Sequence, residues 1–378
     1  MSVTGYYDWR EFDARVGDRT IRYASKPGLP GWDEDDHAAR LLGESIEIRP
    51  GDRLIDLRCG RGVVVALAAQ RGADVTASDD YILAVEATRR TLALNGVRAS
   101  ILSPGDQLPS GCDVAVIVIP KNREVVRQLI DTASAALKPG GRVYLAGANR
   151  SGVKSAIDDL AAVFGGVTTL AYGKGHRVAT ATRPASLEVG ASDIFRQVEV
   201  EARGEVWRVV TGAGVFSRDH LDEGTRHLIE TMSVRAGESL LDLGCGCGIV
   251  GLVGARLGNH VTCVDASADS VEATHRTLST NGVRHAEVFW SDCASAVRDR
   301  QYDVVATNPP FHQGVGTDYD VARQFVDDAA AVLRPGGRLV LVANRFLRYE
   351  RDMAGLFADV RVIYEDGRFR VLEAVKHG

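Results

Sequence analysis

No stretch of this sequence is apolar enough to cross a bilayer. Runs such as residues 114–119 contain six apolar residues, whereas a membrane-spanning helix needs about 20. Residues 1–12 mix aromatic and charged side chains and lack the apolar core of a signal peptide. We therefore expect a cytoplasmic protein with no membrane partner.

Cysteine pairs with the spacing of metal sites are also missing. The six cysteines include no Cys-x-x-Cys, and Cys245 and Cys247 flank Gly246 too closely for a usual zinc site, with no histidine pair nearby. We expect reduced thiols in the core or in loops, and no bound metal.

Lysine is scarce, and basic charge is not in excess. Six lysines accompany 39 arginines, a bias that suits bidentate phosphate contacts but also fits a GC-rich genome. The net charge of −5 is not that of a strongly basic nucleic-acid-binding protein. Residues 1–190 carry +1 and residues 191–378 carry −6, so the first half is the less repulsive surface for a polyanion.

The sequence does contain a duplication. Residues 56–97 align without a gap onto residues 242–283, and 21 of these 42 positions are identical. A repeat at an offset of 186 residues indicates a duplicated domain rather than a solenoid. Residues 183–192, with Pro184, Gly190 and several small residues, read as a linker. We therefore predict two domains, over residues 1–185 and 186–378.

Each copy alternates strand and helix patterns. In the second copy we predict a hairpin over 198–211 that turns at Arg203-Gly204. Further predicted strands are 239–243, 260–264, 287–290, 304–307 and 338–342, with a closing antiparallel pair near 360–364 and 369–375. Predicted helices lie near 221–232, from the glycine turn to about 257, and over 267–280 and 319–333. The first copy follows the same order and ends near Thr182. This alternation predicts an α/β fold, with a mostly parallel sheet and helices on both faces.

A glycine turn follows the first strand of the second copy. Gly244, Gly246 and Gly248 allow a ligand to approach the backbone closely, and Asp242 can hold a cationic or hydroxylated group there. The spacing is Gly-x-Gly-x-Gly rather than the Gly-x-Gly-x-x-Gly of dinucleotide-binding proteins, which argues against a nicotinamide oxidoreductase.

Two acids end the next two strands. Asp265 comes 23 residues after Asp242, and its two carboxylate oxygens suit the two hydroxyls of a ribose. The alternative for Asp265 is a helix N-cap. Asp292 is placed to accept from an adenine amino group, and the alternative for Asp292 is an ordinary loop acid.

The fourth strand runs into Asn308-Pro309-Pro310-Phe311. The two prolines cannot donate backbone hydrogen bonds, so this segment presents carbonyl acceptors, an amide and an aromatic ring at the carboxyl end of a strand. Open α/β sheets bind ligands at that edge. The alternative is a rigid turn that leaves a buried strand. Nearby Asp303 and His312 invite acid–base roles, but we interpret them as a strand-end residue and a pocket wall.

In this order, these motifs resemble the class I S-adenosylmethionine-dependent methyltransferases. With residues 214–217, 221–225 and 308–313 added, the chain resembles the RsmC/RlmG ribosomal RNA guanine-N2 methyltransferases over nearly its whole length. The resemblance implies two tandem Rossmann-like domains, each with a mostly parallel seven-stranded sheet. It implies that S-adenosylmethionine is the cofactor, and that Ala266 and Phe216 help the glycine turn and the two strand-end acids to bind it. It also implies that the substrate is ribosomal RNA, 16S rather than 23S.

The chemistry implied is methylation of a planar amino nitrogen. The Asn308 side-chain carbonyl and the Pro309 backbone carbonyl would each accept one N–H, with Pro310 stiffening the turn and Phe311 stacking on the base. Asn308 would also border the cofactor. The target base would be single-stranded or flipped out. We expect a monomer.

The first copy departs from this pattern at two positions. Arg58 replaces the first glycine, and residues 117–121, Ile-Val-Ile-Pro-Lys, replace the Asn-Pro-Pro-Phe segment. We therefore expect no methylation by the first copy. The resemblance implies that it helps to recognise RNA, and Arg58, Arg61, Lys121 and Arg123 could offer a phosphate-binding surface or be scattered surface charges.

Three alternatives remain open from the sequence. The acceptor could be a protein glutamine or an adenine N6, which the same Asn-Pro-Pro-aromatic motif serves. The chain could instead be a non-catalytic RNA-binding or ribosome-assembly protein with two degenerate domains. A nicotinamide oxidoreductase is the most distant alternative.

Overall fold

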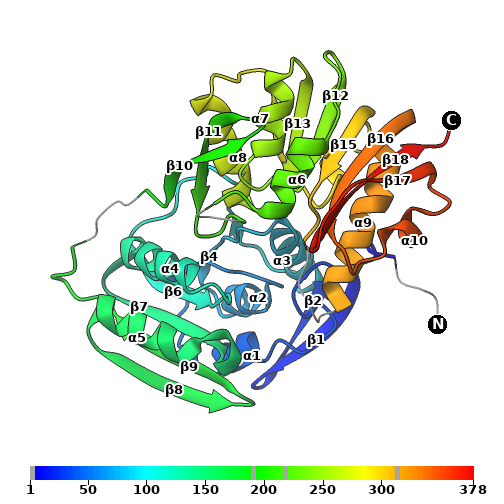
Figure 1. Ribbon diagram of the computed structural model, residues 1–378. Helices are drawn as coiled ribbons and strands as arrows, with labels where there is room; N and C mark the ends of the chain where they lie inside the picture. Colours follow the sequence, from blue (N-terminus) through cyan, green and yellow to red (C-terminus); the bar gives the residue numbers. More distant parts are fainter. Residues whose placement is uncertain (1–4, 189–192, 217–219, 311–315) are drawn as a thin grey trace. The chain divides into compact units, whose positions relative to one another are not determined.

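The computed structural model describes residues 5–188, 193–216, 220–310 and 316–378. The chain divides into two compact units, unit 1 (Met1–Asp193) and unit 2 (Ile194–Gly378) (Figure 1). The division falls at the carboxyl end of the segment that the sequence predicts as a linker. No helix in the described ranges combines the length and the apolar character needed to cross a membrane.

Unit 2 is built on a seven-stranded sheet that is parallel except at one side. Its strands run in the order β14 (Glu287–Trp290), β13 (His260–Asp265), β12 (Ser239–Leu243), β15 (Tyr302–Thr307), β16 (Leu333–Asn344), β18 (Phe369–Lys376) and β17 (Phe357–Glu365). Only the β16–β18 and β17–β18 pairs of this sheet are antiparallel. Its helices are α6 (Glu223–Thr231), α7 (Ile249–Arg256), α8 (Ala268–Thr280), α9 (Gly316–Val332) and α10 (Tyr349–Met353).

Unit 1 repeats this topology. Its sheet has the order β5 (Ser100–Ile101), β4 (Asp74–Ala77), β3 (Arg53–Asp56), β6 (Cys112–Val118), β7 (Leu137–Ala148), β9 (His176–Thr182) and β8 (Val167–Gly173). Helices α1 (His37–Ser45), α2 (Val63–Gln70) and α3 (Ile82–Leu94) pack on one face, and α4 (Arg123–Ala136) and α5 (Val153–Phe164) pack on the other. The predicted α/β fold, with two mostly parallel seven-stranded sheets, is confirmed.

A hairpin precedes each sheet and is anchored to a helix in the same way. In unit 2, β10 (Phe195–Ala202) and β11 (Glu205–Gly212) turn at Arg203 and Gly204, both with positive φ. Thr277 Oγ1 of α8 accepts the Val210 N–H at 2.8 Å, and the Asn281 amide donates to the Arg208 carbonyl at 2.6 Å.

The hairpin of unit 1, β1 (Arg10–Val16) and β2 (Arg19–Ser25), uses a Thr and an Asn at the equivalent positions. Thr91 Oγ1 accepts the Ala24 N–H at 3.1 Å, and the Asn95 amide donates to the Arg22 carbonyl at 2.6 Å. The Thr-Leu-x-x-Asn-Gly-Val tract shared by the two halves therefore serves the fold, because it holds each hairpin against its domain.

Most predicted elements of unit 2 lie where the sequence places them. Strands 239–243 and 287–290 have the predicted bounds. Strand β16 begins at Leu333 rather than near residue 338, and the short helix α10 is not predicted. Every residue of β15 is buried, as expected for a central strand with helices on both faces.

Candidate active site

Three predicted site residues lie side by side at the carboxyl edge of the unit 2 sheet, each one position beyond a row of paired strand residues. Leu243 of β12 pairs with Val264 of β13 on one side and with Thr307 of β15 on the other. The next residues along these parallel strands are therefore Asp265, Gly244 and Asn308. Neighbouring strands lie about 4.8 Å apart, so the sheet itself brings an acid, a glycine turn and an amide together.

The glycine turn has all three of its glycines in the left-handed region. Gly244, Gly246 and Gly248 have φ of +80°, +56° and +78°. A Cβ on Gly246 would meet nothing within 4 Å, one on Gly244 would lie 2.9 Å from Phe325, and one on Gly248 would lie 2.7 Å from Thr274. Gly246 therefore leaves the open face that a ligand needs, whereas Gly248 makes room for packing between α7 and α8.

Asp265 fastens the turn to the next strand. Its Oδ2 accepts the Gly246 N–H at 2.9 Å, and its Oδ1 accepts the Ser267 N–H at 2.9 Å. The helix N-cap alternative for Asp265 is wrong, because α8 is capped by Ser267, whose hydroxyl accepts the Ser270 N–H. Each carboxylate oxygen can accept more than one hydrogen bond, so these bonds are compatible with a ribose at the same group.

Asp242 lies beneath the turn rather than at its surface. It is buried, and its Oδ2 accepts the Gly251 N–H of α7 at 2.9 Å. Burial raises the pKa of Asp242 to about 7, with the Asp265 charge adding to the rise and the Gly251 N–H opposing it. This placement lets Asp242 hold the start of α7 in position under the turn.

Further predicted cofactor-binding residues line the same edge. The Ala266 carbonyl accepts the Trp290 indole N–H at 2.8 Å, and Ser291 donates its N–H to the Asp265 carbonyl at 2.8 Å, which leaves half-buried Asp292 just beyond. Phe216 is 63% exposed. Its loop lies beside the start of α8, because a Cβ on Gly214 would collide with the Asp269 carboxylate.

Asn308 is half-buried and is held from both sides. The preceding Thr307 donates its hydroxyl to the Leu243 carbonyl at 2.7 Å. The Asn308 amide nitrogen donates to Asp222 Oδ2 at 3.0 Å and to Thr225 Oγ1 at 2.8 Å. Pro309 is buried and Pro310 is exposed. The predicted stacking residue Phe311, and His312, lie outside the described residues.

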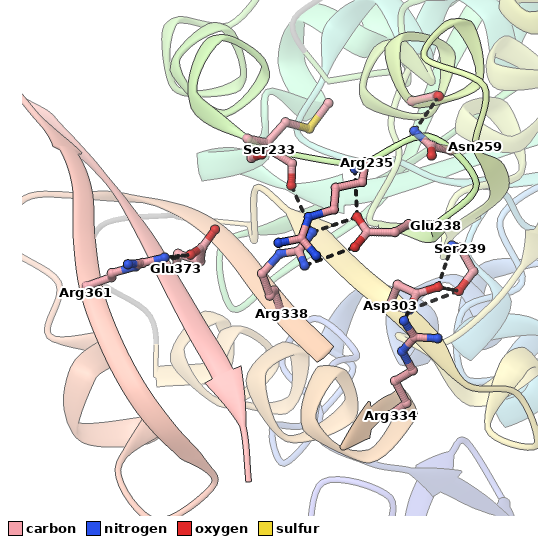
Figure 2. A network of polar contacts seen from close by, with 12 residues as sticks. Ser233, Arg235, Glu238, Ser239, Asn259, Asp303, Arg334, Arg338, Arg361 and Glu373 are labelled. Atoms are coloured by element: carbon pink, nitrogen blue, oxygen red, sulfur yellow. Dashed lines mark hydrogen bonds and ion pairs between the residues drawn. The ribbon is translucent and has the colours of Figure 1, made fainter. Parts of the chain in front are cut away.

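Asp303 lies at the opposite edge of the sheet. It is the second residue of β15 and lies beside Ser239, whose N–H and hydroxyl both donate to Asp303 Oδ2 at 2.8 Å. Asp303 also pairs with Arg334 (Figure 2). Thr307 lies four residues further along the strand, a distance of about 13 Å. These contacts agree with the interpretation of Asp303 as a strand-end residue and argue against direct acid–base chemistry by it.

A second ion pair stabilises the same edge. Arg338 donates to both carboxylate oxygens of Glu238, at 3.1 and 2.7 Å, and to the Ser233 carbonyl at 3.1 Å (Figure 2). The amino edge of the sheet is thus held by two charge pairs, each with its carboxylate buried or half-buried, which leaves the carboxyl edge for ligands.

The equivalent row of unit 1 has a different composition. It reads Asp79, Arg58 and Val118. Arg58 Nε lies 3.8 Å from Asp79 Oδ1, so the arginine occupies the side of the acid where unit 2 has a glycine. Arg61 is buried and pairs with Asp36 at 3.3 Å, and Arg123 pairs with Asp159 at 2.8 Å. These contacts favour structural roles for the three arginines over a phosphate-binding surface.

The cysteines of the glycine turn are not nucleophiles. All six cysteines are free, and burial raises the pKa of Cys247 to about 11 and that of Cys245 well above its ordinary value. Both thiols therefore stay protonated at neutral pH, when they are weakly reactive.

One polar cluster, formed by two residues of α6 and one residue near the carboxyl end of the chain, was not predicted from the sequence. Glu223, His227 and Asp366 have ligand-type atoms within 4.8 Å of one another. Arg368 pairs with Glu223 at 2.6 Å, and His227 Nε2 lies 3.0 Å from Asp366 Oδ2 while its ring stacks on Tyr364. Arginine thus offsets the charge of Glu223, and Asp366 lies against the histidine ring. The i, i+4 spacing of Glu223 and His227 is visible in the sequence, but Asp366 is too distant to predict.

Comparison with known proteins identifies the fold family. A family model described as methyltransferase small domain matches the chain twice, over residues 20–180 and 206–373. The chain belongs to the methyltransferase small domain family. Its two matches coincide with the two sheets described above.

Several relatives in this family are similar over most of the chain. Ribosomal RNA small subunit methyltransferase C of Hahella chejuensis is 34% identical over 83% of this chain and 91% of the relative. The protein of the same name from Escherichia coli is 34% identical over 74% of this chain and 80% of the relative. The 16S rRNA guanine-N2 methyltransferase RsmC of T. thermophilus, solved in complex with AdoMet and guanosine, has a TM-score of 0.84 and 29% identity and covers 97% of this chain and 98% of its own. The resemblance seen in the sequence is confirmed.

Proposed function

We propose that this chain transfers a methyl group from S-adenosylmethionine to the exocyclic N2 amino group of a guanine in 16S ribosomal RNA. The observation that carries the proposal is the row of Asp265, Gly244 and Asn308 on adjacent parallel strands. This row puts a ribose acceptor, an open backbone turn and an amide acceptor at one edge. The similar T. thermophilus enzyme, which binds AdoMet and guanosine, supports the same cofactor and acceptor.

The residues present fit S-adenosylmethionine. The open face of Gly246 would admit the ligand, the Asp265 carboxylate would accept from the ribose hydroxyls, and Asp292 would accept from the adenine amino group. Ala266 and Phe216 line the same edge, with Gly244, Gly248 and Asp242 shaping the turn. When bound, the cofactor supplies an electrophilic methyl group on a sulfonium.

The acceptor side of the site orients a poor nucleophile. The lone pair of an exocyclic amino nitrogen is drawn into the base, so the nitrogen must be held towards the methyl group. In this proposal the Asn308 side-chain carbonyl and the Pro309 backbone carbonyl each accept one N–H and stabilise the positive charge that develops on nitrogen. Pro310 stiffens the turn and Phe311 stacks on the base.

No dedicated base is needed. The nitrogen–methyl bond forms as the sulfur–methyl bond breaks, and the methylated nitrogen then becomes acidic enough to lose its proton to water. The target guanine must be unpaired or flipped out of its helix to reach this edge.

The two units have separate roles in this proposal. Unit 2 contains the whole site, so a monomer suffices, and the enzyme works in the cytoplasm on ribosomal RNA or a ribosomal subunit. Unit 1 does not methylate, because Arg58 lies against Asp79 and valine replaces the amide. Its role is to support unit 2 and to contribute to RNA recognition.

The test is methylation of rRNA from a strain that lacks this protein. Purified protein and labelled S-adenosylmethionine are added, and the products are digested to nucleosides. Label in N2-methylguanosine from 16S rRNA is the expected result. Label in N6-methyladenosine or in a ribosomal protein would overturn the acceptor, and no transfer with intact subunits or naked RNA would overturn the activity.

A further inference from the structure

The first turn of α6 contacts Asn308 through two side chains. Asp222 is the N-cap of α6, and its Oδ2 accepts the Thr225 N–H at 2.8 Å. The same oxygen accepts an Asn308 N–H at 3.0 Å, and Thr225 Oγ1 accepts the other at 2.8 Å. Both residues lie in segment 221–225, which contributes to the sequence resemblance, but the proposed chemistry assigns them no role.

The hydrogen bonds fix which way the amide faces. A carboxylate can only accept, so the group facing Asp222 must be the amide nitrogen. Thr225 lies 3.2 Å from Asp222 Oδ2 and donates its single hydroxyl proton there, which leaves its oxygen lone pairs for Asn308. Both hydrogens of the Asn308 amide are thereby engaged. A flip by 180° would set the Asn308 carbonyl against the Asp222 carboxylate.

Unit 1 separates the folding role of this segment from its role at Asn308. Asp36 occupies the matching N-cap of α1, and its Oδ1 accepts the Ala39 N–H at 3.0 Å. Alanine thus replaces the threonine, valine replaces the asparagine, and Arg61 approaches the remaining oxygen of Asp36 at 3.3 Å. The cap is present in both units, whereas the hydroxyl and the amide occur together in unit 2 alone of the two.

We propose that Asp222 and Thr225 are positioning residues that hold the Asn308 carboxamide with its carbonyl oxygen facing the substrate amine. The inference rests on the proposed function, in which that oxygen accepts a substrate N–H. Both residues act through Asn308, so their loss should lower kcat and leave S-adenosylmethionine affinity unchanged. They also reject an amide facing the other way, which would present two donors to an amine that itself donates.

The central test compares four variants by kcat, cofactor affinity and thermal stability. T225A gives unit 2 the residue of unit 1 and should lower kcat about 10-fold or more. T225S keeps the hydroxyl and should restore kcat to within about 2-fold of wild type. T231A is the matched control, because the Thr231 hydroxyl bonds to the His227 carbonyl in the last turn of the same helix. D222S keeps a capping side chain but loses the carboxylate, and its kcat should fall at least as far as that of T225A.

A double-mutant cycle and a measurement without turnover complete the test. In an N308A background, T225A should change residual kcat by less than about 2-fold, since nothing is left to position. In the wild type with labelled asparagine, NMR should show slow exchange of the Asn308 side-chain amide protons with solvent. T225A should make this exchange faster.

The possible outcomes are distinct. A wild-type protein that fails to methylate rRNA refutes the proposed function, and slow exchange that T225A accelerates would still support the held amide. If the wild type is active, three results would refute the positioning role. These are full kcat in T225A, a loss of kcat in T231A as large as in T225A, or independent effects of T225A and N308A on kcat.

Discussion

Asp79 of unit 1 and Asp265 of unit 2 accept the same two backbone hydrogen bonds. Each carboxylate accepts one N–H from the glycine at the same position of its turn, Gly60 or Gly246, and one from the residue two positions after the acid. The distances are 3.0 and 3.1 Å for Asp79 and 2.9 and 2.9 Å for Asp265. An acid at this position therefore stabilises the fold whether or not a ligand is bound, and the two acids form a natural pair for experiment.

We expect D265A to weaken S-adenosylmethionine binding about 100-fold, because two charge-assisted hydrogen bonds to the ribose are lost. D79A removes the same backbone contacts from unit 1 and should leave cofactor affinity unchanged. Isothermal titration calorimetry measures both. An equal loss of affinity in D79A, or two cofactor molecules bound per chain, would contradict the assignment of a single site.

For N308A we expect kcat to fall about 100-fold or more while the protein stays folded. The substrate amine loses the acceptor that orients it, whereas the cofactor loses only a bordering group, so S-adenosylmethionine affinity should change less than about 5-fold. Steady-state methylation and calorimetry on one preparation separate the two effects. A large loss of cofactor affinity with unchanged kcat would reassign Asn308 to the cofactor alone.

Replacing Gly244 by the residue of unit 1 should abolish cofactor binding. G244R demands a side chain at φ +80° and a Cβ 2.9 Å from Phe325, so we also expect unit 2 to lose about 1–2 kcal/mol of stability. The reciprocal change, R58G, should leave methylation by the enzyme unaltered. Calorimetry and thermal unfolding check both variants, and normal binding by G244R would show that the first glycine is dispensable.

At the amino edge of the unit 2 sheet, D303N should lower the stability of the protein but leave kcat almost unchanged. The carboxylate accepts two hydrogen bonds from Ser239 and pairs with Arg334, and the amide keeps one acceptor and no charge. We expect a loss of about 1–3 kcal/mol and kcat within about 2-fold of wild type. D113N is the counterpart in unit 1, where Asp113 accepts the Arg53 N–H at 2.8 Å. A pH-dependent fall in kcat for D303N alone would restore an acid–base role.

Stability should depend on pH through Asp242. Burial raises its folded-state pKa from 3.8 to about 7, so between these values the folded chain binds more protons than the unfolded chain. Its contribution to stability is complete below about pH 4 and is lost as the pH rises through 7. The limit for a shift of this size is roughly 4 kcal/mol.

The neutral variant D242N lacks this pH dependence. Its melting temperature relative to wild type should therefore rise between pH 5 and pH 8, as measured by scanning calorimetry. Burial also raises the pKa of Asp56 to about 7 in unit 1, so D56N should behave alike. A difference that does not vary with pH would show that Asp242 is ionised throughout.

Much of the sheet was predictable because central strands leave a simple pattern. Strand 239–243 lies between a turn before it and the glycines after it, and its bounds match the structure. Strand β16 was harder. Pro335 and the two glycines after it look like a turn, yet Leu333 already pairs with Tyr302 ahead of a register shift. The helix Tyr349–Met353 is little more than one turn, too short to show an apolar period.

The site was predictable as a set of positions but not as a set of contacts. The order of acids and glycines along the chain assigns them to one edge, because parallel strands share their carboxyl ends. The partners of Asn308 were beyond reach, since Asp222 and Thr225 precede it by more than 80 residues and no periodicity links them. The N-cap alternative for Asp265 failed because Ser267 takes that role two residues later.

The shared task of Asp79 and Asp265 affects how repeated domains are counted. A carboxylate that joins a turn to a strand is kept in both units, and the family model matches both halves of the chain, so that match reports the shared scaffold and not the number of cofactor sites. The two halves differ at the first residue of the turn, which is Arg58 in one half and Gly244 in the other. In this chain the two units therefore share the acid and differ at the turn, which is the difference that the D79A and D265A pair would expose.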